Sequence, residues 1–359
     1  MRRQQSGLAL LMVLLFFALA SVIATSIIEQ QSMNIQRTTG QLATQQARAF
    51  AWGVESVVRS GLYLDWEDNP DIDHYMEQWT IDRSFPMEQG TVFVHIVDAQ
   101  GLFNLNWLAP AASNHKVWQA RFQRLLKNLG GNVEFAETLA NWMNSESQAD
   151  DLYSRLEVPY RAAYRICSDI SEVRLLDGMD EDTWVKLEPY ITCLPASTQL
   201  NVNTALDQVL AALDDDFGLD GAMAVIGERG EDGIASVDDF WNIAEVANAA
   251  SGKKSSSTTT SSSSSLSDSS ASDDSSSSDS SDDDSSTTNV RWSQDDFTVK
   301  TSYFLVFTRV DIGTEGDWLA TSQFMLRRQA DDGSMSIISR DYSRREAIQL
   351  PAPAASSSF

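Results

Sequence analysis

The stretch that decides the fold is SGLALLMVLLFFALASVIATSIIEQ, residues 6–30, at the head of the chain. Arg2 and Arg3 precede it, and the 21 residues from Leu8 to Ile28 include no charged side chain. A helix needs about 20 mostly apolar residues to cross a bilayer, whereas the apolar core of a signal peptide has about 7–15. Leu8–Ile28 therefore predicts a transmembrane helix whose arginines remain in the cytoplasm.

Cleavage of an ordinary signal peptide is the alternative for this segment. The small residues that it would use are Ala18, Ala20, Ser21 and Ala24. Such a cleavage would release the rest of the chain as a secreted protein.

The residues that follow favour a retained helix. No proline interrupts the sequence up to Leu62, and apolar residues recur at spacings of three and four, which is typical of one apolar helix face. These residues are Ala47, Phe50, Ala51, Val54, Val57, Val58, Gly61 and Leu62. We predict one helix from about Leu8 to about Leu62, roughly 80 Å long at 1.5 Å per residue, with Gly40 tolerated inside it.

A short basic leader that ends in glycine, followed by such a helix, resembles the type IV pilin and pseudopilin class. The resemblance implies that a membrane peptidase cuts between Gly7 and Leu8 and that the new amino group is methylated. Gly7 is then the last leader residue and not part of the helix. Members of this class usually carry glutamate at the fifth mature position, which is Met12 here. The missing glutamate implies a subunit with no neighbour above it, as in the protein K family of type II secretion systems.

Composition limits the alternatives. The 359 residues include 51 acidic and 26 basic side chains, which give a formal charge of −25. This charge argues against non-specific nucleic-acid binding, which depends on Lys and Arg. The chain is long enough for one large or two modest domains.

Two groups of strands enclose a helical segment. TVFVHIVDAQGLFNLNWL, from Thr91, predicts two short strands around a turn at Gln100–Gly101, and three more strands are expected between 297 and 342, with turns at 313–316 and 331–333. Helical patterns such as HKVWQARFQRLLKNL lie between them. We expect an α+β fold: a pilin-like long N-terminal helix packed on a small antiparallel sheet, with a large all-helical inserted domain.

The expected organisation has seven parts. The Ser/Asp-rich run at residues 251–289 has only two apolar residues, so burial of apolar surface cannot offset the entropy lost on ordering. We therefore expect this run to be a disordered linker, with a calcium or partner tether as the alternative. In order, the parts are a leader (1–7), the transmembrane half of the helix (8–28), the first part of the pilin-like core (29–108), the inserted helical domain (109–250), the disordered insert (251–289), the second part of the core (290–345) and a flexible tail (346–359).

Three stretches carry the resemblance to the protein K family across most of the chain. VDAQGLFNLNWL resembles the family's D-x-x-G-x-x-N-L-N segment, the residues from Leu139 to Thr192 resemble its central helical block, and LNVNTALDQVLAAL resembles the block that follows. The resemblance implies calcium binding in the central block, where the matching positions are Asn144, Glu146 and Asp150, with Asp151 beside them. Carboxylate and amide oxygens suit calcium, but Asn and Asp replace the family's Asp at 144 and Glu at 150. A solvated acidic loop is the alternative.

Cys167 and Cys193 are the only cysteines. Beyond the membrane the compartment is oxidising, which favours a disulfide between them; two buried free thiols are the alternative. Zinc is not expected, since the chain has no CxxC motif and its three histidines, His74, His95 and His115, are distant in sequence.

Residues 170–192 and 200–230 resemble helix–hairpin–helix units, a motif that often holds DNA through backbone amides. A membrane-anchored DNA-uptake protein is therefore the alternative function. The acidic hairpin LDGMDEDT would repel phosphate, so we interpret these units as packing modules and expect no nucleic-acid partner. No GxSxG, HExxH or Walker motif is present, so we do not expect an enzyme.

The resemblance thus implies a minor pseudopilin that caps the tip of the type II secretion pseudopilus, helps to initiate its assembly and supports export of folded exoproteins. The expected partners are other minor pseudopilins, prepilin peptidase and, further, the secretin and exoproteins. The expected location is the inner membrane, with a single span and the bulk of the chain in the periplasm.

Overall fold

The computed structural model describes residues 6–87, 90–252, 292–312 and 318–342. The expected linker at 251–289, the tail at 346–359 and the turn at 313–316 lie almost wholly outside these residues. The chain divides into two compact units. The first comprises residues 1–68, 78–97 and 304–348, and the second comprises residues 69–77, 98–303 and 349–359. The boundary thus lies at Val97–Asp98, whereas the sequence placed it at Leu108–Ala109.

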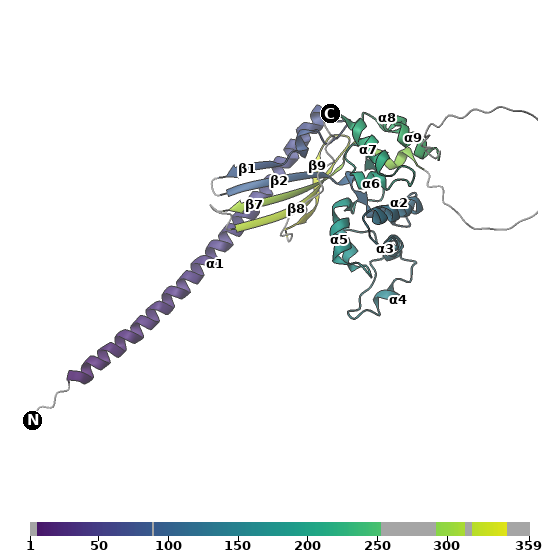
Figure 1. The fold of residues 1–359 in the computed structure, drawn as a ribbon. Helices are drawn as coiled ribbons and strands as arrows, with labels where there is room; N and C mark the ends of the chain where they lie inside the picture. The colour runs from purple at the N-terminus through teal and green to yellow at the C-terminus, as the bar shows by residue number, and fades with distance from the viewer. Residues whose placement is uncertain (1–5, 88–89, 253–291, 313–317, 343–359) are drawn as a thin grey trace, which may run out of the picture. The chain divides into compact units, whose positions relative to one another are not determined.

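The first unit is built on one long helix and one sheet (Figure 1). The helix, α1, spans Ser6–Asp68 and ends where Asn69 precedes Pro70, because a residue before proline is disfavoured in helical conformation. The sheet has the strand order β1-β2-β7-β8-β9, and β1/β2 and β8/β9 pair antiparallel. Its elements are η1 (Gln78–Thr80), β1 (Arg83–Met87), β2 (Gly90–Asp98), β7 (Tyr303–Ile312), β8 (Trp318–Arg328) and β9 (Met335–Asp341).

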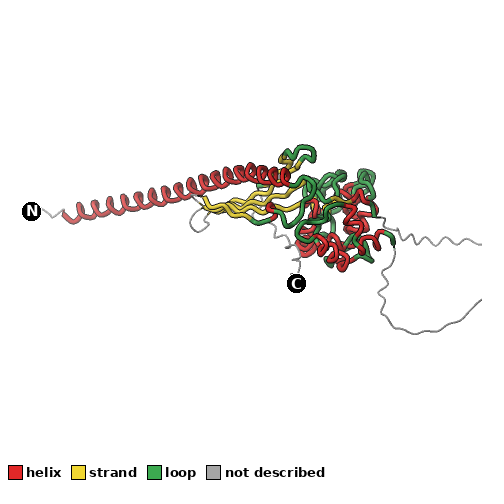
Figure 2. Tube along the Cα trace, turned by 90° about the horizontal axis from the view of Figure 1, so that it is seen from above, coloured by secondary structure: helices red, strands yellow, loops and turns green. Residues whose placement is uncertain are grey.

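Small side chains bring α1 close to the sheet. Ala43, Ala47 and Ala51 recur every four residues and are buried, so they form one smooth row that lies against the strands. Val54, Val58 and Leu62 continue this sheet-facing row. On the sheet, Val92 and Val94 alternate with exposed Phe93 along β2, as the strand period of two requires. The N-terminal half of α1 extends beyond the sheet (Figure 2).

The second unit is mainly helical. It also contains two parallel pairs of two residues each, β3 with β4 and β5 with β6. Its helices are η2 (Ala99–Gly101), η3 (Leu105–Leu108), α2 (His115–Asn128), α3 (Phe135–Met143), α4 (Asp150–Tyr153), η4 (Ile170–Leu175), α5 (Glu181–Leu187), η5 (Glu188–Tyr190), α6 (Asp207–Ala211), α7 (Gly218–Arg229), α8 (Val237–Asn242), α9 (Ala244–Ala250) and η6 (Gln294–Asp296), and its strands are β3 (Phe103–Asn104), β4 (Ile191–Thr192), β5 (Leu200–Asn201) and β6 (Phe297–Thr298).

Aromatic stacking and one buried cation organise the core of this unit. Trp107 and Trp118 stack with ring centroids 3.9 Å apart, and Phe103 meets both edge-on. Arg121 is fully buried beside Trp118 and forms an ion pair with Asp296, with Nη1 and Oδ2 3.2 Å apart. This pair fixes the chain just after residue 291 to the middle of α2.

The expected fold class is confirmed: a long N-terminal helix packs on a small antiparallel sheet, and a helical insertion interrupts the sheet. The hairpin expected at Gln100–Gly101 is wrong, because β2 and β3 belong to different sheets. The carboxylate of Asp98 accepts a hydrogen bond from the Gln100 backbone N–H and starts a 3₁₀ turn. That turn takes the chain out of the sheet instead of reversing it.

Candidate functional site

The N-terminal half of α1 exposes a continuous apolar surface. The helix is long and apolar enough to cross a membrane, and no residue of its most apolar window is buried. Met12 lies on this surface with 55% of its area exposed. Gly7 and Leu8 both lie in the first turns of α1. The expectation that Gly7 stands outside the helix is therefore wrong for the unprocessed chain, because the helix extends through this glycine to Ser6.

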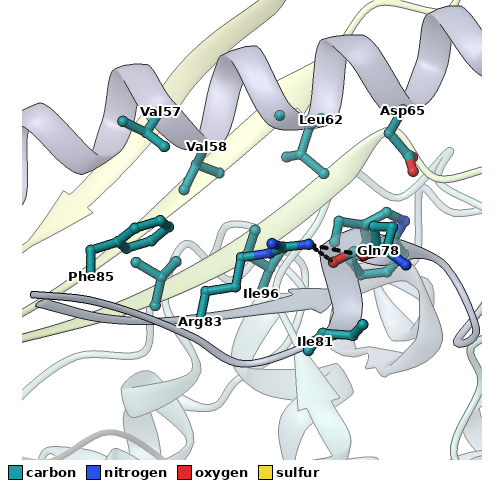
Figure 3. Close-up of a pocket in the computed structure, with 12 residues that line it drawn as sticks. Val57, Val58, Leu62, Asp65, Gln78, Ile81, Arg83, Phe85 and Ile96 are labelled. Carbon is teal, nitrogen blue, oxygen red and sulfur yellow. Dashed lines mark hydrogen bonds between the residues drawn. The ribbon is translucent and has the colours of Figure 1, made fainter.

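A groove follows the other half of α1 within the first unit. Val57, Val58 and Leu62 point from the helix toward Phe85 and Ile96 of the sheet and enclose a cavity of about 340 Å³ (Figure 3). The remaining lining residues are Gly61, Asp65, Gln78, Trp79, Ile81, Arg83 and Val94. The Arg83 guanidinium donates to the side chain and to the backbone carbonyl of Gln78, both at 3.1 Å. The Arg83 guanidinium is thus held at Gln78, and apart from Asp65, Gln78 and Arg83 the lining is apolar.

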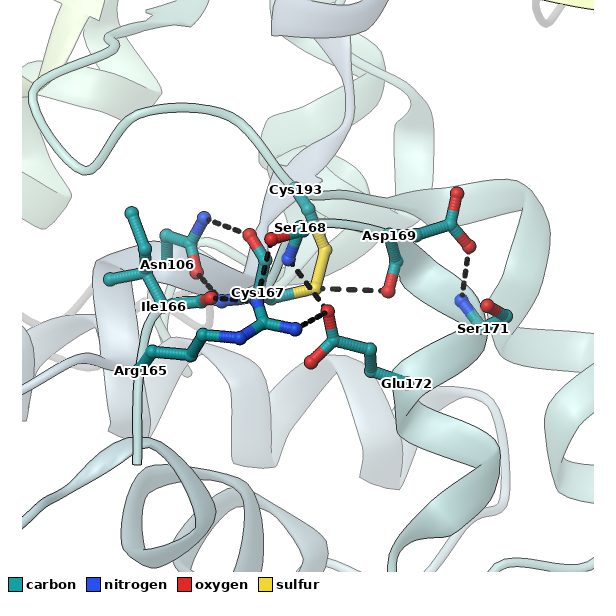
Figure 4. A network of polar contacts seen from close by, with 9 residues as sticks. All are labelled: Asn106, Arg165, Ile166, Cys167, Ser168, Asp169, Ser171, Glu172 and Cys193. Carbon is teal, nitrogen blue, oxygen red and sulfur yellow. Dashed lines mark hydrogen bonds and ion pairs between the residues drawn. A yellow bond between two sulfur atoms is a disulfide. The ribbon is translucent and has the colours of Figure 1, made fainter. Parts of the chain in front are cut away.

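In the second unit, Cys167 and Cys193 form a disulfide with Cα atoms 5.6 Å apart (Figure 4). The disulfide expected from the sequence is confirmed. Asn106 supports it: its Oδ1 accepts from the Cys167 backbone N–H at 2.7 Å, and its Nδ2 donates to the Cys167 and Leu194 carbonyls. The bridge therefore lies in a network that is anchored from η3.

Sequence reasoning missed that this anchor occurs twice. In Asn104-Leu-Asn106 and again in Asn201-Val-Asn203, the first asparagine accepts from the backbone N–H of the second. Asn203 also forms two bonds with the backbone of one distant residue, Ile234, as Asn106 does with Cys167. The signal was visible, since each N-x-N begins at the last residue of a two-residue strand, in a segment that already carried the family resemblance.

The residues expected to bind calcium lie close in the chain but do not form a preassembled site. In the part of the chain that the structure describes, Glu146, Asp150 and Asp151 do not bring three carboxylate oxygens within 4.8 Å of one another. Asn144 Oδ1 accepts from the Glu146 backbone N–H, and Asp150 Oδ1 accepts from the Ala162 backbone N–H. These oxygens stabilise the protein's own loop, so calcium binding here would require the loop to rearrange.

The helix–hairpin–helix resemblance leads to an acidic turn. In the first unit of the motif, η4 and α5 are joined by residues 176–180. The Asp180 carboxylate accepts from the Thr183 backbone N–H at 2.6 Å, so it occupies the helix N-terminus where a phosphate would bind. Glu181 forms an ion pair with Arg174, with Oε2 and Nη2 2.7 Å apart. The Asp180 carboxylate thus takes the place that a DNA phosphate would take, which agrees with a packing role for this hairpin.

The buried carboxylate of Asp98 links distant segments of the second unit. Asp98 is almost fully buried, and its Oδ2 accepts from the hydroxyl groups of Thr204 and Thr301 and from Asn201 Nδ2. Burial raises the pKa of Asp98 to about 6, against the lowering effect of the hydrogen bonds from Thr204, Thr301 and the Gln100 backbone N–H. Asp98 and Thr301 lie near the two ends of the inserted sequence. The Asp98 carboxylate therefore connects the first residues of the insertion to its last residues.

A membrane-type helix packed on a small antiparallel sheet defines the pilin-like class of protein. The structure is similar to the crystal structure of the GspK-GspI-GspJ complex from the enterotoxigenic Escherichia coli Type 2 Secretion System. The TM-score is 0.65 at 23% sequence identity, and the match covers 86% of this chain and 99% of that chain. The likeness shows the shared fold.

Sequence comparison is more specific. Family models described as "Type II secretion system (T2SS), protein K" match residues 101–196 and 200–260. Type II secretion system protein K of Pseudomonas aeruginosa is 35% identical over 260 residues, 67% of this chain and 77% of that protein. The Klebsiella pneumoniae protein K is 33% identical over 220 residues, 57% of this chain and 68% of that protein. The chain belongs to the protein K family of type II secretion systems, the minor pseudopilins, which are structural components of a secretion apparatus.

Proposed function

We propose that this chain caps the tip of the type II secretion pseudopilus, helps to initiate its assembly and so supports export of folded exoproteins across the outer membrane. The observation that carries the proposal is Met12, an exposed apolar residue at the position where the pilin class has glutamate. A carboxylate in a membrane span is costly unless it is paired. A subunit with no neighbour above it has no amino terminus to neutralise, so methionine costs less there.

The size of the helical unit supports the same position. It includes residues 98–303, whereas the described part of the first unit is built on one long helix and a five-stranded sheet. A thin filament of stacked pilin-like subunits has no room for such an insertion along its length. At the end of the filament no further subunit would clash with the insertion.

Maturation and location follow from the helix. Prepilin peptidase would cut between Gly7 and Leu8, and methylation would follow at the new amino terminus. Residues 8–28 would hold the protein in the inner membrane, and the bulk of the chain would lie in the periplasm. The disulfide between Cys167 and Cys193 supports an oxidising compartment.

The proposed partners are other minor pseudopilins at the tip. The similar solved structure is a complex of GspK with GspI and GspJ, which supports this class of partner. The capped tip would then face the secretin and the exoproteins.

Calcium binding by Asn144, Glu146, Asp150 and Asp151 requires the loop between α3 and α4 to rearrange, because its oxygens do not converge. Calorimetric titration of the purified full chain with calcium chloride tests the site. We expect binding that Glu146→Gln with Asp151→Asn abolishes and that Asp220→Asn, on α7, leaves intact. Equal binding by all three proteins would move the site elsewhere.

The function is tested first on the mature protein from membranes. Its mass and N-terminal sequence should show a methylated chain that begins at Leu8. A start near Ser21 or Thr25 would remove the filament helix and contradict the proposal.

A second experiment addresses the tip position. Met12→Glu should lower exoprotein secretion at least tenfold, because the added carboxylate has no partner, whereas Met12→Leu should secrete as the wild type does. Full secretion by Met12→Glu, with the protein spread along the filament, would contradict a tip location.

A further inference from the structure

The two outer strands of the sheet in the first unit differ in how their free edges are protected. Among the described residues, β1 and β9 are these outer strands, so each has one side that no further strand pairs. Proteins protect such a side with proline, with charged residues or with a β-bulge, because unpaired backbone groups bind other extended chains. A stretch of edge that has none of these devices therefore indicates a strand-binding surface.

The edge at β1 is protected. All five side chains of β1 are exposed, and Pro86 lies opposite Thr91 of β2. Within a sheet, proline occurs where its missing N–H would have faced away from the neighbouring strand. Pro86 thus removes a donor from the free edge of a strand that is only five residues long. β1 is therefore a poor template for another strand.

The second half of β9 is protected as well. Ile338 is an extra residue between Ile337 and Ser339, which lie opposite consecutive residues of β8, so it forms a β-bulge. Two positions further on, Arg340 donates to the Glu55 carboxylate of α1 through Nε at 2.8 Å and through Nη2 at 2.9 Å. The bulge and the ion pair thus close this half of the edge.

The first half of β9, Met335–Ile337, has none of these devices and is here called the open edge. Where β8 turns into β9, the Gln329 N–H donates to the Ser334 carbonyl at 2.8 Å. Bonded and non-bonded pairs alternate along an antiparallel ladder, and the register opposite β8 is regular here. Met335 and Ile337 therefore direct their N–H and C=O groups away from β8, where these groups are available to a further strand.

A hollow of about 470 Å³ lies beside the open edge and is lined by α1 and by the start of β9. Tyr63 lines it from the helix, with 41% of its area exposed. Trp66 lies directly against Gly333, which also lines the hollow, since a Cβ atom there would be 2.3 Å from the ring. The other lining residues are Ser56, Arg59, Ser60, Leu64 and Met335. An extended chain that pairs with the open edge would therefore direct alternate side chains toward this hollow.

Arg59 is the charged residue of the described lining. Its Nε donates to the backbone carbonyl of Glu55 at 3.3 Å, and it belongs to none of the ion pairs between described residues. The Glu55 carboxylate itself is bonded to Arg340. A carboxylate on an entering strand would thus meet a guanidinium that has no other carboxylate partner there, and Ser56 and Ser60 add hydroxyl groups to the same hollow.

We propose that the open edge and the hollow bind an exposed edge strand of a folded exported protein. Backbone bonds to Met335 and Ile337 hold the strand, an apolar side chain packs on Tyr63, and a carboxylate pairs with Arg59. The inference rests on the proposed function and adds to it the binding surface and the feature of the cargo that is recognised.

The chemistry of the surface favours this partner over one of fixed sequence. Bonds to a strand's backbone depend on its extended conformation and not on its side chains, so one open edge binds folded proteins of unrelated sequence. A dedicated partner would be matched by several oriented polar groups, whereas the described lining of the hollow has one charged side chain. An edge strand exists only in a folded protein, so this recognition would select cargo that has already folded.

Photocrosslinking in secreting cells tests the proposal. A genetically encoded benzophenone amino acid replaces Ile338, beside the open edge, or Tyr63, in the hollow. The matched controls are Val57, in the groove, and Met87, on β1, because their exposed fractions of 55% and 42% are close to the 49% and 41% of the test positions. We expect crosslinks from positions 338 and 63 to exported proteins, identified by mass, at least tenfold stronger than from positions 57 and 87.

Variants of the open edge give a second, independent measurement. Ser336→Lys adds a charge to the edge at an exposed side chain, and Ile337→Pro removes an N–H that faces away from β8. Each should lower the crosslink from position 63 and the amount of secreted protein at least fivefold. Ser336→Lys should melt within about 2 °C of the wild type, so its result stands even if the proline variant does not fold.

Control variants on the other side of α1 complete the comparison. Ser84→Lys, on the edge that is already protected, should leave crosslinking and secretion unchanged. Arg59→Gln should weaken the crosslink from position 338 about threefold, whereas Arg83→Gln, beside the groove, should not. Wild-type secretion by both Ser336→Lys and Ile337→Pro would overturn the proposal.

The outcomes separate this inference from the function on which it rests. Equal crosslinking from all four positions, or crosslinks from positions 338 and 63 to another pseudopilin or to the secretin, overturns only the strand-binding role. Cells that lack this chain and still secrete normally would overturn the proposed function as well.

Discussion

Asn106 hydrogen-bonds both to the backbone N–H and, through its side-chain amide, to the backbone carbonyl of Cys167. One fully buried side chain thus satisfies both polar groups of a residue 61 positions further along the chain. A third bond, to the Leu194 carbonyl, holds the residue that follows the other cysteine, Cys193. The position of the disulfide is therefore set by an asparagine as well as by the sulfur–sulfur bond.

Asn106→Ala should destabilise the helical unit by about 3 kcal/mol, because it leaves several buried backbone groups without partners. The measurement is chemical unfolding of the detergent-solubilised full chain, followed by tryptophan fluorescence. Asn128→Ala, at an exposed position on α2, is the matched control and should change the unfolding free energy by less than about 0.5 kcal/mol. A similar loss in both variants would contradict the anchoring role.

Removal of the disulfide should cost about 3–4 kcal/mol, because the bridge closes a separation of 26 residues. The change is Cys167→Ser together with Cys193→Ser, and the unfolding midpoint is compared with and without dithiothreitol. Reductant should lower the wild-type midpoint to that of the double variant and should leave the double variant unchanged.

The Asp98 carboxyl predicts a pH dependence. Its pKa is raised from 3.8 to about 6 in the folded protein, so its stabilising contribution is complete below pH 3.8 and is lost as the pH rises through 6. The difference in unfolding free energy between the wild type and Asp98→Asn should therefore fall by about 3 kcal/mol from pH 4 to pH 8. Because the other acidic groups are the same in both proteins, subtracting the unfolding free energy of Asp98→Asn from that of the wild type removes their contribution. A difference that stays flat across this range would show that Asp98 titrates normally.

Removal of one partner of the buried ion pair between Arg121 and Asp296 should strongly lower the free energy of unfolding. Asp296→Asn leaves the buried guanidinium without its counter-charge and should cost about 3–5 kcal/mol. The exposed pair of Arg174 and Glu181 is the matched control, and Glu181→Gln should cost less than about 1 kcal/mol. Urea unfolding monitored by fluorescence measures both. If the two variants lose equal stability, burial of the first pair does not set its contribution.

Periodic patterns predicted most of the first unit. The spacing of Ala47, Ala51, Val54, Val58 and Leu62 gave the sheet-facing side of α1, and alternation gave the late strands. Both signals depend on short-range periods, which a single sequence displays directly. The helix ended at Asp68 instead of about Leu62, because the end was set by Pro70 and not by the last apolar residue.

The details of the second unit depend on contacts between distant residues. The hairpin at Gln100–Gly101 failed because Asp98 starts a 3₁₀ turn there. The other carboxylate oxygen of Asp98 binds Thr204 and Thr301, 106 and 203 positions away, and no local pattern encodes those bonds. The pairing of Cys167 with Cys193 was predictable because only two cysteines exist. The bonds of Asn106 and Asn203 were not, since a repeated N-x-N shows which residues turn but not which backbone they bind.

The contacts of Trp292 and Gln294 with α8 have a practical consequence for experiments on this protein. The ring of Trp292 lies against Phe240 and Trp241 of α8, and Gln294 donates to Asp238 of the same helix. Ser251 and Gly252 follow α9, which begins two residues after the end of α8. The linker predicted from the sequence at 251–289 would thus begin after α9 and end near α8, and closing a longer loop between fixed ends costs only about 0.6 kcal/mol per doubling of its length. A fluorescent protein or an affinity tag placed between residues 253 and 291 should therefore report on the subunit in living cells without disturbing either unit.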